Sequence, residues 1–304
     1  MMDSPNGRPL EILLADDGSE HAKAAVALLE DLPLPPEAKV TALRVFTPTQ
    51  SSEHAIFQAA LDQTQAQLQS KGLQVATELL LGYPAEKIIE YADAHRPDLI
   101  VLGAKGLRAT FGILLGGVAQ QVVEYAQWPV LVVRAPYQGL RHVLLVVDGS
   151  PYSKAAVNTL CGGEQCARFP LPKGVELHVM HVLPPILPPV TFVDARFPGL
   201  DPLSEPIITA RLAQQAEEER QGGELIEQTI ALLQSQGLEA TGVLPRGDAA
   251  TEIIAYVHAN PVDLIVAGSR GLSQVRGWLM GSVSRKLIHY SGCSVLIAKV
   301  AAPS

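Results

Sequence analysis

An internal repeat limits the folds open to this 304-residue chain more than any other feature of its sequence. Residues 82–107 align without a gap with residues 247–272, a separation of 165 positions. Earlier in each copy, Asp17-Gly18-Ser19 corresponds to Asp148-Gly149-Ser150, a separation of 131. A period this long indicates duplication of a whole domain rather than a solenoid of short units. The sequence therefore predicts two domains, residues 1–137 and 138–304, joined by a linker at 136–139.

The growing separation also locates an insertion in the second copy. The ends of the second strands, Val45 and Val182, are 137 positions apart, so the remaining 28 extra residues follow Val182. We place the insertion at about residues 183–211, which include the run PPILPPV. A connection this long is usually functional or mobile. It could form a lid over the second site or an interaction arm, and the alternative is an extension packed on the surface.

Within each copy, short Val/Ile/Leu-rich runs alternate with amphipathic stretches, which is typical of a parallel sheet covered by helices on both faces. The first half predicts strands at residues 11–15, 40–46, 75–81, 99–102 and 130–133, and helices at 19–29, 53–70, 85–95 and about 116–127. The second half repeats this order from residue 143. The predicted fold class is α/β, with two tandem doubly wound parallel five-stranded sheets, each a Rossmann-like sandwich.

The run Leu264 to Val283 combines a strand, a glycine loop and a helix start. Its glycines follow the pattern G-x2-G-x9-G-S, with Gly268, Gly271, Gly281 and Ser282 at the fixed positions. The first half keeps the spacing at Gly103, Gly106 and Gly116, but Gly117 stands where the serine would be. Strand, glycine loop and helix start allow backbone amides to approach phosphate closely. The ligand-free alternative is a pair of tight strand-to-helix turns.

Topology predicts which other residues join these loops. Ligands of doubly wound sheets bind at the carboxyl ends of the strands. That rule brings Asp148, Val182 and Gly268 together in the second half. In the first half, it brings Asp17, Val45 and Gly103 together.

Composition excludes several classes of protein. The net charge is −8, and no dense Lys/Arg cluster provides the basic face of a general nucleic-acid binder. No apolar run approaches the roughly 18 residues of a membrane span, and no signal peptide is recognisable, so a cytoplasmic protein is expected. The three cysteines lack zinc-ligand spacing and are interpreted as reduced thiols.

With these motifs, the chain resembles the universal stress proteins in a tandem arrangement, over nearly the whole of both halves. The resemblance rests on V-V-D-G-S after strand one, the glycine pattern after strand four and a P-V-L-type final strand. It implies binding of ATP, or of ADP or AMP, with Mg2+ or Mn2+ on the phosphates in some members. It also implies that the apolar fifth strands of the two halves pair as an internal dimer, which covers their edges. Further homo-oligomers are compatible with it.

Carried over by position, the resemblance assigns one set of adenine-nucleotide-binding residues to each half. The second-half set is Val146, Asp148, Val182, Gly268, Arg270, Gly271, Gly281, Ser282 and Val283. The first-half set is Ala15, Asp17, Val45, Gly103, Lys105, Gly106, Gly116, Gly117 and Val118. The side-chain chemistry agrees with these roles. The carboxylate of Asp148 can accept hydrogen bonds from an adenine amino group or a ribose hydroxyl, Arg270 and Lys105 can balance phosphate charge, and Ser282 can cap the helix and donate to phosphate.

The glycine at position 117 sets the two halves apart. Losing one hydrogen bond to a charged group costs about 1.5–3 kcal/mol, or about 10- to 150-fold in affinity. We therefore predict that the second half is the stronger ATP site.

The leading interpretation is a non-enzymatic ATP-binding stress or signalling protein, in which nucleotide occupancy sets conformation or partner binding. No P-loop, strand-linked GxGxxG or nucleophile elbow is present. Two alternatives remain, a weak Mg2+-dependent ATP hydrolase that uses Asp148 and a ligand-free interaction module. His178 and His181 are three positions apart on a strand, so they are expected to point to opposite faces rather than to share a metal.

Overall fold

The computed structural model describes residues 9–107, 115–162, 169–186, 205–271 and 280–300. Its strands form one ten-stranded sheet in the order β3-β2-β1-β4-β5-β10-β9-β6-β7-β8. The first five and the last five strands of this order belong to the two halves of the sequence, and each set is parallel. The predicted pair of doubly wound five-stranded sheets is therefore confirmed, and the two sheets are continuous.

The elements of the first half lie close to their predicted positions. Its strands are β1 (Glu11–Ala15), β2 (Lys39–Phe46), β3 (Gln74–Leu81), β4 (Leu99–Gly103) and β5 (Val130–Val133). Its helices are α1 (Glu20–Asp31), α2 (His54–Gln69), α3 (Pro84–His95) and α4 (Gly117–Tyr125), and a 3-10 helix, η1 (Pro48–Glu53), precedes α2. The predicted start of α2, residue 53, is thus the last residue of η1. The 3-10 helix itself begins at Pro48, and proline is favoured in the first turn of a helix.

The second half repeats the order of strands and α-helices. Its strands are β6 (His142–Val146), β7 (Glu176–Met180), β8 (Ala240–Val243), β9 (Leu264–Gly268) and β10 (Ser294–Ala298). Its helices are α5 (Pro151–Cys161), α6 (Glu205–Ser235), α7 (Ala249–Ala259) and α8 (Ser282–Tyr290).

The prediction that the second strand runs to Val182 was wrong, because β7 ends at Met180 and only an isolated bridge joins Leu183 to Arg246. Helix α6 begins at Glu205, so the last residues of the predicted insertion, 205–211, are helical and extend α6 beyond the length of its 16-residue counterpart α2. Residues 187–204, with most of the proline-rich run, lie outside the described residues, as does the proposed lid or arm.

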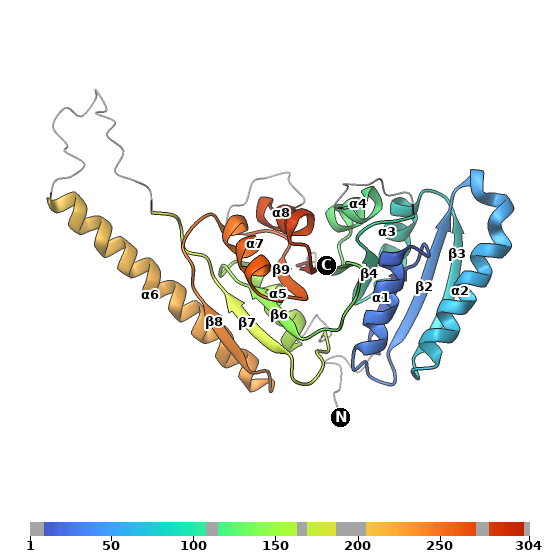
Figure 1. Cartoon of the computed structure of the whole chain (residues 1–304), viewed down its shortest axis with the longest axis horizontal. Coiled ribbons are helices and arrows are strands. Elements are labelled where there is room, and N and C mark those ends of the chain that lie inside the picture. The colour runs from blue at the N-terminus through green and yellow to red at the C-terminus, as the bar shows by residue number, and fades with distance from the viewer. Residues whose placement is uncertain (1–8, 108–114, 163–168, 187–204, 272–279, 301–304) are drawn as a thin grey trace, which may run out of the picture.

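The helices cover both faces of the sheet (Figure 1). On one face α1, α2, α5 and α6 pack on a core that includes Leu14, Val133, Leu145 and Ala298. On the other face α3, α4, α7 and α8 pack on a second core. The central strands β5, β9 and β10 are buried along their whole length, which agrees with their continuous apolar sequences.

The seam between the halves is the antiparallel pair β5–β10, in which Leu131 lies opposite Leu296. The predicted pairing of the fifth strands as an internal dimer is confirmed by this register. The two edges that most need covering thus cover each other. In Figure 1, α4 and α8 lie side by side above the seam, and α2 and α6 lie at the outer ends.

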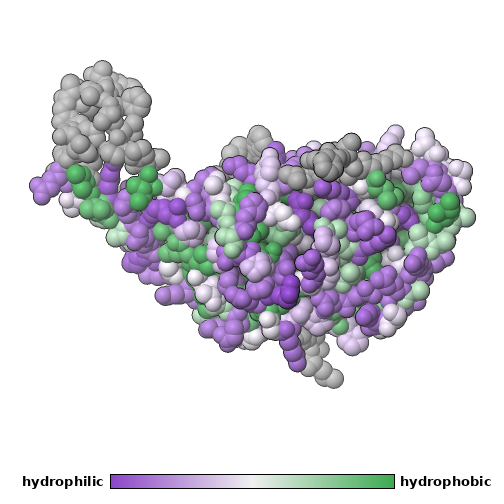
Figure 2. All heavy atoms as spheres, in the orientation of Figure 1, coloured by the Kyte–Doolittle hydropathy of each residue, from purple (hydrophilic) through white to green (hydrophobic). Residues whose placement is uncertain are grey.

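Helix α6 is the largest departure from the symmetry of the halves. It has 31 residues, compared with 16 in α2, and is about 46 Å long at 1.5 Å per residue. Its N-terminal end extends beyond the sheet, and hydrophobic residues are visible at that end in Figure 2. Among the described residues there, Ile208 and Leu212 are exposed. None of the helices in the described ranges has the length and apolar character that spanning a bilayer requires.

Candidate functional site

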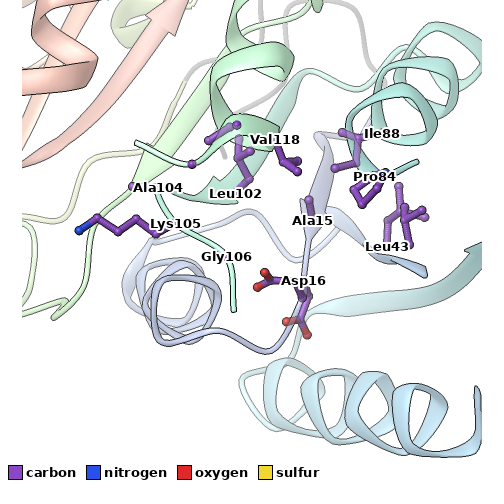
Figure 3. Close-up of a pocket in the computed structure, with 16 residues that line it drawn as sticks. Ala15, Asp16, Leu43, Pro84, Ile88, Leu102, Ala104, Lys105, Gly106 and Val118 are labelled. Atoms are coloured by element: carbon purple, nitrogen blue, oxygen red, sulfur yellow. The ribbon is translucent and has the colours of Figure 1, made fainter. Parts of the chain in front are cut away.

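Each half has a cavity at the carboxyl ends of its strands, on the face covered by its third and fourth helices. The first cavity has a volume of about 280 Å³ and the second about 110 Å³. Figure 3 shows the first, where the β1 end, the loop after β4 and the start of α3 face one another.

The structure brings together every residue that the sequence assigned to the two sites. The first cavity is lined by Ala15, Asp17, Val45, Gly103, Lys105, Gly106, Gly116, Gly117 and Val118. The second is lined by Val146, Asp148, Val182, Gly268, Arg270, Gly271, Gly281, Ser282 and Val283. Residues 108–114 and 272–279, which lie between the second and third glycines of each loop, are outside the described residues.

The aspartate after the first strand holds two loops together. In the first half, Asp17 Oδ1 accepts a hydrogen bond from the Ser19 amide at 3.0 Å, and Oδ2 accepts one from the Leu107 amide at 3.2 Å. In the second half, Asp148 Oδ1 accepts from the Ser150 amide at 2.9 Å. Each carboxylate therefore lies between the start of a helix and the glycine loop, with its charge oriented by backbone donors.

The serines that follow, rather than the aspartates, cap the helices. The Ser19 hydroxyl accepts from the Ala22 amide at 3.2 Å and donates to the Lys105 carbonyl at 3.0 Å. Ser150 accepts from the Ser153 amide at 3.1 Å. Ser19 and Ser150 are thus the N-caps of α1 and α5, and helix capping is not the reason for an aspartate at positions 17 and 148.

Packing accounts for the first two glycines of each loop without any ligand. A Cβ at Gly268 would lie 2.5 Å from the backbone carbon of Tyr152, and one at Gly103 would lie 2.7 Å from that of His21. A Cβ at Gly106 would lie 2.6 Å from Asp17 Oδ2. Glycine thus allows the fourth strand to contact the first helix, and the loop to contact the aspartate. The sequence analysis kept a ligand-free alternative for these glycines, and the close packing is a structural reason of that kind.

The third glycine and its successor form the start of the last helix. Gly116 and Gly281 are the N-caps of α4 and α8, with no side-chain capping bond. Ser282 is therefore the first residue of α8 and not its cap, contrary to the sequence interpretation. A Cβ at Gly117 would meet nothing within 4 Å, so the first cavity has room for the side chain that it lacks.

The two loop cations occupy different surroundings. In Figure 3 the Lys105 side chain extends away from Asp16 and Leu43. The Arg270 guanidinium lies 5.5 Å from the centre of the Tyr152 ring and donates to its hydroxyl at 3.2 Å. His21 occupies the position in the first half that Tyr152 has in the second. Burial lowers the pKa of His21, and Lys105 and Arg134 lower it further, so its imidazole is held in the neutral form.

Sequence reasoning missed Asp16, which also lines the first cavity, and the polar contacts around it. The buried Asp16 carboxylate accepts from the Thr64 hydroxyl at 2.7 Å and from the Gly18 amide at 2.8 Å. The buried Arg44 lies beside Gly18, with its guanidinium 5.1 Å from the Phe57 ring centre. The doublet Asp16-Asp17, which corresponds to Val147-Asp148, was the available signal.

The apolar walls of the cavities were also missed. Pro84 and Ile88 of α3 line the first cavity, and Ala249 and Ile253 of α7 line the second. The signal was the repeat itself, because these residues begin the ungapped match of the two halves.

His178 and His181 point to opposite faces, as predicted. His178 Nδ1 is 2.6 Å from the Tyr256 hydroxyl of α7, whereas a Cβ at Gly222 of α6 would lie 3.0 Å from the His181 ring. His181 Nδ1 is 2.9 Å from the Val147 carbonyl, to which it donates.

The geometry therefore combines, twice, an oriented aspartate, an apolar wall, a glycine loop and a helix start at the ends of parallel strands. The model of the universal stress protein family matches the chain over residues 10–134 and 139–299. The chain belongs to the universal stress protein family. This membership places it among the stress-response proteins, in a tandem form.

Individual relatives are more distant. A universal stress protein of Bacillus subtilis, YxiE, is 34% identical over 83 residues, which are 27% of this chain and 56% of the relative. One from Methanothermobacter thermautotrophicus is 40% identical over 57 residues, 19% of this chain and 38% of the relative. The match thus spans about half of these relatives or less.

Solved structures agree over the whole chain. A universal stress protein from Archaeoglobus fulgidus has a TM-score of 0.62 and 19% identity, and the match covers 97% of both chains. A putative universal stress protein from Pseudomonas aeruginosa has a TM-score of 0.62 and 16% identity over 95% of this chain and 92% of that one. At these identities the likeness concerns the fold.

Proposed function

We propose that this tandem universal stress protein binds adenine nucleotides in its two cavities, and that occupancy sets its conformation or its binding to a partner. The observation that carries the proposal is the convergence, in each half, of an oriented aspartate with a glycine loop and a free helix N-terminus. A helix start offers unpaired amides and a positive dipole end to phosphate.

Each part of the nucleotide has a matching group in the second cavity. Asp148 offers acceptors to an adenine amino group or ribose hydroxyls, and Val182 lines the wall where a base would lie. Ser282 and the first amides of α8 would hold phosphate, and Arg270 at the rim would balance its charge. In the first cavity Asp17, Val45 and the start of α4 take the same places.

A bound divalent ion would depend on the nucleotide for its ligands. Within the described ranges, no group of three or more His, Cys, Asp or Glu side chains could hold a metal ion. Mg2+ or Mn2+ would therefore be coordinated by the phosphates and water, as Mg2+ commonly is in phosphate sites.

We further propose that the second cavity is the tighter ATP site, although the first is larger. Cavity volume sets what can enter, whereas affinity for phosphate depends on donors and charge. The hydroxyl at Ser282 has no counterpart at Gly117.

Mass spectrometry of nucleotide released from freshly purified protein tests the proposal. Near one adenine nucleotide per chain is the expected result, and titration calorimetry with ATP should then give one tight and one weak site. Two equally tight sites would contradict the ranking. A chain that neither carries nor binds any adenine nucleotide would favour a ligand-free interaction module, and ATP turnover above background that is lost in Asp148→Ala would favour a hydrolase.

A further inference from the structure

One cation follows the last strand of each half, and each reaches into the other half. The Arg134 guanidinium, just after β5, donates to the carbonyl of Ile288 at 2.5 Å and to that of Cys293 at 3.1 Å. The Lys299 ammonium, just after β10, donates to the carbonyl of Val123 at 2.7 Å. Both contacts cross the β5–β10 seam, so each cation binds the last helix of the opposite half.

The two contacts are equivalent under the repeat. Arg134 and Lys299 are 165 positions apart, and so are their acceptors Val123 and Ile288. In both cases the acceptor lies in the last turns of a nine-residue helix, α4 or α8. A cation at a helix C-terminus is stabilised by the dipole and by the unpaired carbonyls there.

The opposite ends of these helices belong to the cavities. Helix α4 begins at Gly117 in the first cavity, and α8 begins at Ser282 in the second. Nine residues rise only about 13 Å, so a short rigid helix connects each cavity to a cation of the other half. A side-chain contact reinforces the seam, because Arg285 of α8 lies 3.2 Å from Glu124 of α4.

We propose that Lys299 and Arg134 are positioning residues that each set the helix start of the opposite half's cavity. Lys299, in the second half, fixes α4 and hence the phosphate end of the first cavity. Arg134, in the first half, does the same for α8 and the second cavity. The inference rests on the proposed nucleotide binding, and it predicts that substitutions act across the seam.

The charge of Lys299 supports the same assignment. Burial, and to a smaller extent Arg270, lower the pKa of Lys299 to about 8, although Glu124 opposes this shift. Lys299 thus lies within electrostatic reach of Arg270, which lines the second cavity, while its ammonium group donates to the helix of the first. The cation is lost as the pH rises through about 8, which weakens its hydrogen bond to Val123.

The experiment measures each cavity separately in the full-length chain. Asp148→Ala leaves the first cavity as the reporter, and Asp17→Ala leaves the second. Titration calorimetry with ATP and Mg2+ is then performed with Lys299→Met, with Lys299→Arg and with the exposed Lys71→Met as a matched control. Arginine is a suitable conservative replacement, because the equivalent position in the first half is Arg134.

The expected result is a crossed effect. Lys299→Met should weaken ATP binding in the first cavity by about tenfold, the order of one charged hydrogen bond, and leave the second unchanged. Lys299→Arg should keep the ATP affinity of the first cavity and remove the decline in that affinity above pH 8. Equal losses in both cavities, or a loss in the second alone, would overturn the inference.

A ligand-free measurement separates this inference from the proposed function. Hydrogen exchange in Lys299→Met should increase at the amides of α4 and remain unchanged in α8. If neither cavity binds ATP, the proposed function fails, and exchange still tests whether Lys299 positions α4. Unchanged exchange in α4 would refute that role.

Discussion

The empty space at Gly117 makes the difference between the halves directly testable. Gly117→Ser restores to the first cavity the hydroxyl that Ser282 provides in the second. A Cβ at Gly117 meets nothing within 4 Å, and the residue is the first of α4, with helical backbone. The side chain therefore enters without displacing a neighbour, and replacing glycine in a helix adds stability of about 0.5 kcal/mol or less.

The expected gain in affinity follows from one hydrogen bond. A bond from a hydroxyl to a charged phosphate contributes about 1.5–3 kcal/mol, which corresponds to about 10- to 150-fold tighter ATP binding. The lower end is more realistic here, because position 117 is exposed and water competes for the phosphate. We therefore expect roughly tenfold.

Titration calorimetry of ATP in an Asp148→Ala chain measures this gain in the first cavity. Gly117→Ala is the matched control, since it adds the Cβ without the hydroxyl and should leave affinity near that of the parent. The reciprocal change, Ser282→Gly in an Asp17→Ala chain, should weaken the second cavity by a similar factor. The reasoning is refuted if Gly117→Ser binds ATP no more tightly than Gly117→Ala.

Two further predictions concern stability. Gly268→Ala should lower the free energy of unfolding by about 1–3 kcal/mol, because its Cβ would lie 2.5 Å from the Tyr152 backbone; urea denaturation measures the change, and a loss no greater than that of Gly117→Ala would contradict it. For Lys299, the folded pKa of about 8 lies below the ordinary 10.5, so between these values the unfolded chain holds the extra proton and stability rises with pH. The free energy of unfolding of the parent chain, relative to that of Lys299→Met, should thus increase by up to about 3 kcal/mol from pH 7 to pH 11. A difference that does not change with pH would show that folding does not lower the pKa of Lys299.

Strand positions and the membership of the two cavities were predictable because both depend on strong local patterns. Continuous apolar runs end at glycine or aspartate, and the topology of a doubly wound sheet then determines which strand ends meet. Asp17, Val45 and Gly103 came together for that reason, although up to 58 positions separate consecutive members of this trio.

What the sequence did not predict depends on backbone contacts and on long-range packing. The roles of Arg134 and Lys299 were invisible, because their partners are carbonyl groups, which every residue carries. The reason for Gly268 lies in the distance between β9 and α5, and no local pattern encodes that distance. The first turns of α6 were assigned to the insertion because the first half has no counterpart for them, since α6 has 31 residues and α2 has 16.

The β5–β10 seam has a consequence for how the two sites can diverge. In an assembly of two identical chains, every substitution appears twice, and dilution separates the partners. Here the partners are one polypeptide, so the seam persists at any protein concentration and each side accepts changes alone. The seam already has this asymmetry, because Arg134 lies on one side and Lys299, whose pKa is lowered to about 8, lies on the other. A shift toward alkaline pH is thus expected to act mainly on the helix at the first cavity, which Lys299 contacts.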